Sequence, residues 1–180
     1  EGAMTETHSM LQRMKTLTTQ AANGTYTQTA RNNIQAEIDA LNKEIGRIAT
    51  TTEFNGEKPL SPAAVNKTMN LTFFIGASPA TANAMTVAQQ AMTQTALKIN
   101  TISVKTTTLA FAAMKSVETA IETVSSYRAT LGAAQNRLEH TVNNLKVTAE
   151  NITSAESRIR DTDMADEITA YTKNNILLQA

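Results

Sequence analysis

The chain has 180 residues, and its sixteen Lys and Arg balance sixteen Asp and Glu, so the formal net charge is zero. Zero net charge argues against a nucleic-acid-binding protein, because phosphate contacts need a basic excess. The absence of Cys excludes a disulfide framework, a thiolate zinc site and a thiol nucleophile.

The two ends of the chain and the lengths of its apolar runs further limit the class of protein to which it can belong. No run approaches the roughly 20 apolar residues of a membrane-spanning helix, so we expect no membrane partner. Residues 1–4 lead into polar sequence without the charged and apolar regions of a signal peptide. Residues 174–180 stop within a helical pattern, with no Gly or Pro to end it. We interpret the chain as a piece of a longer protein.

Two N-terminal segments have the apolar spacing of amphipathic helices. The first runs from residue 4 to 22, and its apolar face consists of Met4, Leu11, Met14, Leu17 and Ala21. Asn23-Gly24 is a helix stop, because Asn and Gly tolerate left-handed backbone. Thr25 or Thr27 caps the second helix. The apolar face of this helix consists of Ala30, Ile34, Ile38, Leu41, Ile45 and Ile48.

The helical period disappears between residue 50 and about residue 105, where all three Pro lie. Phe54-Asn55-Gly56 indicates a turn, and residues 69–75 read as a strand that ends at Gly76. Residues 84–87 and 99–104 are weaker strand candidates. This region is therefore expected to form an antiparallel hairpin with irregular flanks.

A seven-residue period marks the C-terminal part, from about residue 108 to the end. The repeating residues are Val117, Val124, Leu131, Leu138, Leu145, Ile152 and Ile159. Small residues stand three positions after six of these seven, so another helix can approach closely. A strict seven-residue period imposes a left-handed supercoil. One helix over residues 108–180 would be on the order of 100 Å long.

These patterns predict a mainly α fold. We expect an elongated three-helix rod, with two N-terminal helices packed along one long C-terminal helix and a β-hairpin region in the middle. The expected boundaries are 1–52 for the N-terminal helices, 53–106 for the hairpin region and 107–180 for the long helix, all in one domain.

No constellation for catalysis or for metal or cofactor binding is evident. His8 and His140 are the only histidines, and neither has a metal-ligand spacing. The acidic residues around Asp161 and Asp163 lack the ligand order of a calcium loop. The Gly residues are scattered, and no Gly-x-Ser-x-Gly elbow exists. We expect no catalytic residue, no metal, no cofactor and no enzymatic activity.

Several runs resemble the conserved ends of bacterial flagellin. At the N-terminal side they are residues 1–14, 20–24, 34–38 and 47–56. At the C-terminal side they are residues 131–145, 155–165 and 172–177. They include Gln135-Asn136-Arg137 and Ser157-Arg158-Ile159-Arg160-Asp161, which favour flagellin itself over a related protein. Between residues 60 and 105 the resemblance is loose.

The resemblance implies a structural subunit of the flagellar filament, which self-assembles by packing its helical shaft for motility. The implied partners are other flagellin subunits and a flagellar export chaperone. The implied location is extracellular, in the flagellum, without a cleaved signal peptide. Full-length flagellins have further terminal segments that pair as an inner tube. We expect this chain, without them, to be a soluble monomer.

The N-terminal helices carry a candidate protein-binding site. Arg13 lies one turn before Leu17, which we expect to be exposed, and Glu37 lies on the neighbouring helix. This combination is typical of an interaction hot spot. The resemblance implies that this surface binds Toll-like receptor 5, an innate immune receptor. The matching positions are Gln12, Arg13, Leu17, Gln20, Glu37 and, on the long helix, Arg137. The chain departs from recognised flagellins at Lys15-Thr16 and Thr18-Thr19, where Arg-Glu and Ala-Val are common.

Two alternatives to a flagellin subunit remain open, and a missing motif argues against a third, an enzyme. A hook–filament junction protein shares the terminal helices. An unrelated coiled-coil scaffold would self-associate through the stripe from Val117 to Ile159. Some flagellins carry a metallopeptidase insert, but its His-Glu-x-x-His motif is absent here.

Overall fold

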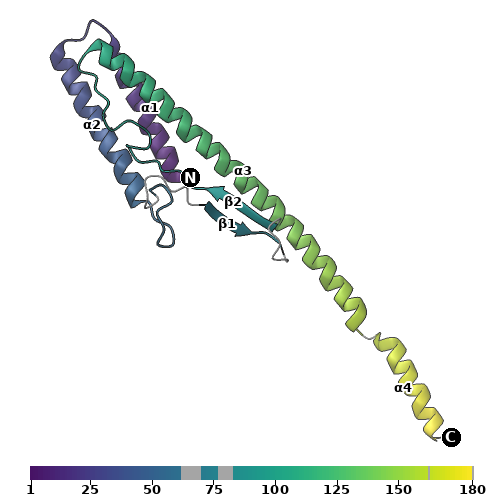
Figure 1. The fold of residues 1–180 in the computed structure, drawn as a ribbon. Coiled ribbons are helices and arrows are strands. Elements are labelled where there is room, and N and C mark those ends of the chain that lie inside the picture. Colours follow the sequence, from purple (N-terminus) through teal and green to yellow (C-terminus); the bar gives the residue numbers. More distant parts are fainter. Residues whose placement is uncertain (62–69, 77–82, 162, 180) are drawn as a thin grey trace. The chain divides into compact units, whose positions relative to one another are not determined.

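The computed structural model of the chain describes residues 1–61, 70–76, 83–161 and 163–179. Over these residues its elements are α1 (Gly2–Ala22), α2 (Gln28–Thr51), β1 (Asn70–Phe74), β2 (Ala84–Ala88), α3 (Thr107–Arg160) and α4 (Met164–Gln179) (Figure 1). The mainly α class, with a hairpin in the middle and a long C-terminal helix, is confirmed. None of the described helices has the length and apolarity needed to span a membrane.

The chain divides into two compact units, Glu1–Asn136 and Arg137–Ala180, which we call the first and second units. The boundary falls within the sequence of α3 and not in a loop. Helix α2 ends at Thr51 and α3 begins at Thr107, and the expected division at residues 52 and 106 stays a prediction. The elongated overall shape stays a prediction.

The core of the first unit is shared by α1, α2 and the beginning of α3. The predicted face of α1 is buried over its whole length, and Ile34, Ile38 and Ile45 form the centre of the buried face of α2. The residues of α3 that join this core are Ala110, Ala113, Val117, Ala120, Val124 and Tyr127. Small and branched residues supply most of the burial there, and Tyr127 is the aromatic side chain among these six residues.

The turn between α1 and α2 is built differently from the prediction. Asn23 has an extended backbone with φ −70°, so left-handed backbone does not end α1. Instead the Arg31 side chain donates to the backbone oxygens of Ala21, at 3.0 Å, and Asn23, at 3.1 Å. These bonds satisfy carbonyls that a helix end leaves without partners. Thr27 is the N-cap of α2, because its side chain accepts from the backbone N–H of Ala30 at 3.3 Å.

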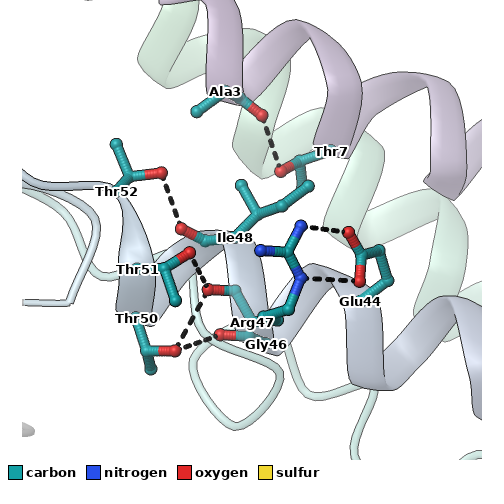
Figure 2. Close-up of polar contacts among 9 residues, drawn as sticks. All are labelled: Ala3, Thr7, Glu44, Gly46, Arg47, Ile48, Thr50, Thr51 and Thr52. Atoms are coloured by element: carbon teal, nitrogen blue, oxygen red, sulfur yellow. Dashed lines mark hydrogen bonds and ion pairs between the residues drawn. The ribbon is translucent and has the colours of Figure 1, made fainter.

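Threonines also satisfy the carbonyls at the C-terminal end of α2 (Figure 2). The hydroxyls of Thr50, Thr51 and Thr52 donate to the backbone oxygens of Gly46, Arg47 and Ile48 at 2.9, 2.7 and 2.6 Å. One turn earlier, the Arg47 guanidinium donates two hydrogen bonds to the Glu44 carboxylate. These hydrogen bonds lower the pKa of Glu44 below its ordinary value. The C-cap residue of α2 is Thr52, whose backbone is extended and whose N–H bonds the backbone oxygen of Ile48 at 3.0 Å.

The predicted turn and two of the three predicted strands are confirmed. Asn55 and Gly56 have φ values of 53° and 79°, and Phe54 and Glu57 pair on either side of them. Strands β1 and β2 pair antiparallel, with Leu71 opposite Val87 and Phe73 opposite Met85. Met69, in the predicted first strand, lies outside the described residues. The third predicted strand, residues 99–104, is wrong: this segment is irregular, and side chains of α2 hold its backbone.

The predicted helix over residues 108–180 is interrupted. Helix α3 ends at Arg160 and α4 begins at Met164. Asp163 accepts hydrogen bonds from the backbone N–H of Ala165, at 2.9 Å, and of Asp166, at 3.4 Å. An Asp side chain that bonds the following N–H groups starts a new helix instead of continuing the old one. Asp163 therefore caps the N-terminal end of α4.

Candidate functional site

Arg13 of α1 and Glu37 of α2 form an exposed ion pair between the two N-terminal helices. The Arg13 Nε donates to Glu37 Oε1 at 2.8 Å, and the second guanidinium contact to the same oxygen is 2.7 Å. The side chains are 55% and 42% exposed, so a pair of this kind stabilises the fold by about 1 kcal/mol or less. Both groups stay accessible to a partner while each fixes the orientation of the other.

Gln12 and Gln20 lie on the exposed side of α1 near this pair. Gln20 donates to the Tyr26 hydroxyl at 2.7 Å, and Gln12 lies 3.4 Å from the His8 Nε2. A shallow groove runs between them, and its lining consists of Gln12, Lys15, Thr16, Thr19, Gln20, Asn23 and Tyr26. The groove is therefore polar, with amide and hydroxyl groups and the Lys15 ammonium group.

Leu17 does not belong to this surface, and the expectation that it is exposed is wrong. It is 2% exposed and lies in the core cluster of the first unit. Leu17 follows Met14 by three residues and precedes Ala21 by four, so helical geometry puts all three on the same buried face. Its contribution is to hold α1 in place under Arg13.

Arg137 is exposed and is the first residue of the second unit. The structure therefore brings Arg13 together with Glu37 within the first unit and places Arg137 in the other one. Lys15, at which the chain departs from recognised flagellins, forms a 3.0 Å ion pair with Glu118 of α3. No local sequence signal could have identified that pair, because its two residues lie on different helices far apart in the chain.

The second candidate surface is the apolar stripe of the second unit. Leu145, Ile152 and Ile159 continue the seven-residue period of α3, yet they are 43%, 63% and 84% exposed. Exposed apolar side chains continue along α4, where a groove is lined by Ile168, Thr169, Thr172, Lys173, Ile176 and Leu177. Extended exposed apolar surface marks sites of association with other chains.

Nothing in the described residues assembles a metal site. They contain no cluster of three or more His, Asp or Glu side chains able to hold an ion. His8 lies partly buried on α1, and His140 is exposed on α3.

Comparison with known proteins identifies the family to which the chain is similar. The model of the bacterial flagellin N-terminal helical region matches residues 1–64, and that of the bacterial flagellin C-terminal helical region matches residues 114–180. Flagellin of Bacillus subtilis strain 168 is 43% identical over 208 residues, which cover 100% of this chain and 68% of that protein. The flagellar filament 33 kDa core protein of Treponema phagedenis is 38% identical over 192 residues, covering 100% of this chain and 66% of that protein.

The crystal structure of Bacillus cereus flagellin has the same fold, with a TM-score of 0.68 and 32% identity over 86% of each chain. A structure of FliC from Burkholderia pseudomallei, 18% identical, resembles the fold with a TM-score of 0.65. The chain spans about two thirds of the length of the two curated relatives described above. The match at both ends and the full-length identity show that the chain belongs to the flagellin family, the structural subunits of the extracellular bacterial flagellar filament.

Proposed function

We propose that the chain is the shaft of a filament subunit and that assembly covers the stripe of the second unit. The supporting observation is that Leu145, Ile152 and Ile159 keep the spacing of the buried residues Val117 and Val124 but remain exposed. Side chains with this spacing are buried when another helix packs on them. Open, heterologous contacts between identical subunits generate helical filaments.

The hairpin takes part in these contacts under the same proposal. All five residues of β1 are exposed, whereas Met85 and Val87 of β2 are buried. We assign β1 to the contact with the next copy along the filament. We also propose that, before assembly, a flagellar export chaperone covers the exposed apolar side chains of α4.

The assembly proposal predicts that this 180-residue chain alone is a monomer, because we assign further subunit contacts to the third of the curated relatives' length that the chain does not span. Light scattering at increasing protein concentration tests this directly. A mass equal to that of one chain is expected. Spontaneous filaments at modest concentration would contradict the proposal, and a discrete parallel dimer would favour the coiled-coil scaffold.

We further propose that the exposed face of the first unit binds Toll-like receptor 5. The ion pair between Arg13 and Glu37 supports this proposal, because two packed helices hold both charges in place before binding. Arginine is enriched among residues that dominate binding energy, and an oriented side chain loses less entropy on association. Gln12 and Gln20 extend the same surface, and Arg137 is proposed as an additional contact. Leu17 supports the surface from beneath.

Receptor binding by Arg13→Ala and Glu37→Ala variants tests this second proposal. Each is expected to weaken binding at least tenfold, the size of loss seen at interface hot spots. The matched control is Arg47→Ala, which removes an exposed arginine from another ion pair on α2. Unchanged affinity in both Arg13 and Glu37 variants, or an equal loss in the Arg47 variant, would exclude this surface as the receptor site.

A further inference from the structure

A segment without helix or strand, residues 89–106, connects β2 to α3, and we call it the strap (Figure 1). Four of its apolar side chains are buried in the core of the first unit: Met92, Leu97, Ile99 and Val104. Buried backbone must find hydrogen-bond partners, and a segment outside regular structure cannot supply enough of them itself. Part of the strap is therefore held by side chains of another element.

The side-chain amide of Gln35, on α2, forms hydrogen bonds with the strap backbone like those of a neighbouring strand. Its Nε2 donates to the backbone oxygen of Ile102 at 3.3 Å, and its Oε1 accepts from the backbone N–H of Val104 at 2.7 Å. Ile102 and Val104 lie on either side of one residue. A residue of a parallel strand bonds the C=O and N–H groups on either side of one residue in the same way. Gln35 is buried, and its Nε2 also donates to Asp39 at 2.8 Å.

Asn42, two turns further along α2, provides a second attachment. Its Nδ2 donates to the backbone oxygen of Ile99 at 2.8 Å, and its own backbone oxygen accepts from the Gln94 side chain. Gln94 lies against Gly46, where a Cβ would come within 2.6 Å of the Gln94 Nε2. Glycine at position 46 therefore leaves the space in which the strap side chain reaches α2.

Beside these two attachments, the strap has irregular backbone hydrogen bonds and one unfavourable backbone conformation. Lys98 adopts a left-handed backbone with φ 56°, which is unfavourable for a residue with a side chain. The backbone N–H groups of Leu97 and Ile99 bond within the strap, to Thr93 and Gln94, and Met92 bonds to Leu60. Segments whose hydrogen bonds are few and irregular open at lower free energy than helices packed on both sides.

We propose that Gln35 and Asn42 form a latch, and that the strap opens as a local unit while α1, α2 and the beginning of α3 stay folded. The opened state exposes Ile99 and Val104 together with the α2 side chains that pack in the same core. Removal of one latch amide leaves buried strap groups without partners, and this favours the open state.

Amide hydrogen exchange on the full 180-residue chain tests the proposal. Gln35→Met retains the length of the side chain but loses both polar groups. Amides of the strap, and that of Val104 above all, are expected to exchange about tenfold faster or more, while amides near Val117 keep their rates. Gln28→Met is the matched control, because exposed Gln28 bonds only Asn32, at 3.1 Å, among the described residues.

Two results would overturn the proposal. Equal acceleration of the strap and of the helices would show that the strap opens only with the whole unit. Unchanged exchange at Val104 would show that Gln35 is no latch. Should Gln35→Met fail to fold, Asn42→Leu serves as a second variant, with accelerated exchange expected around Ile99.

Trypsin cleavage provides an independent measurement. Lys98 is exposed, but the residue that follows it, Ile99, is fully buried, so cleavage between them requires the strap to open. Under native conditions, Gln35→Met is expected to accelerate the first cut after Lys98, as identified by mass spectrometry. Cuts within α1, or at Lys115 in the first-unit part of α3, that precede the cut after Lys98 would contradict a local opening.

Discussion

Val124 and Ile152 occupy equivalent positions of the same seven-residue period, and the structure predicts opposite outcomes when each is changed to Ala. Val124 is fully buried in the core of the first unit, whereas Ile152 is 63% exposed in the second unit. Val124→Ala removes two buried carbon atoms and leaves a cavity. At about 0.8 kcal/mol for each buried carbon, together with the cavity contribution, the expected loss of stability is about 2–3 kcal/mol.

Ile152→Ala removes three carbon atoms that are mostly in contact with water already. The lost burial amounts to less than about 1 kcal/mol, and the higher helix propensity of Ala offsets about half of that. The expected net change in the free energy of unfolding is therefore within about 0.5 kcal/mol of zero.

Urea unfolding followed by far-ultraviolet circular dichroism measures both variants. The denaturation midpoint is expected to fall clearly for Val124→Ala and to remain unchanged for Ile152→Ala, with the same slope in both. An equal loss in the two variants would refute the reasoning, because it would mean that Ile152 is covered in solution. Sedimentation would then be expected to reveal association through the stripe.

Three further outcomes follow from the first unit. Leu17→Ala is expected to reduce the free energy of unfolding by about 2–4 kcal/mol, and Arg13→Ala by less than about 1 kcal/mol, as measured by the same urea titration. Burial raises the pKa of the Tyr127 hydroxyl in the folded chain. The neutral hydroxyl therefore contributes fully to the free energy of unfolding below its ordinary pKa of about 10, and this contribution is lost as the pH rises through the raised pKa of the folded chain. Tyr127→Phe should therefore retain more of its neutral-pH stability than the parent chain when thermal unfolding is followed above pH 10. Lys98→Gly removes the strain of the left-handed backbone and is expected to stabilise the fold by about 1 kcal/mol or less, which raises the thermal midpoint slightly. A lowered midpoint would contradict strain at that residue.

The apolar spacing was sufficient to predict the two N-terminal helices and their buried faces, because an amphipathic helix places every third or fourth residue on one side. The same spacing already placed Leu17 on the buried face of α1, and the expectation that it is exposed disregarded that pattern. Asp163 as a helix cap was also within reach of the sequence, since Asp before a helical pattern favours an N-cap.

The strap could not be predicted in this way. Residues 99–104 are rich in the β-branched residues typical of strands. A strand needs a partner strand, however, and the pattern of one segment contains no information about its partner. Gln35 and Asn42 are polar, and the helical pattern of the sequence places them on the outer surface of α2. Only their bonds to a segment more than fifty residues later explain why they are buried.

The sequence by itself determined the helical class, the position of the hairpin region and the resemblance to flagellin, because periodicity and turn chemistry act over a few residues. Tertiary structure alone decided which part of the seven-residue stripe is covered. The stripe has the same spacing at Val124 and at Ile159, but the core of the first unit includes only residues up to Leu131. Burial depends on which other elements lie nearby, and a repeating pattern along one helix does not specify them.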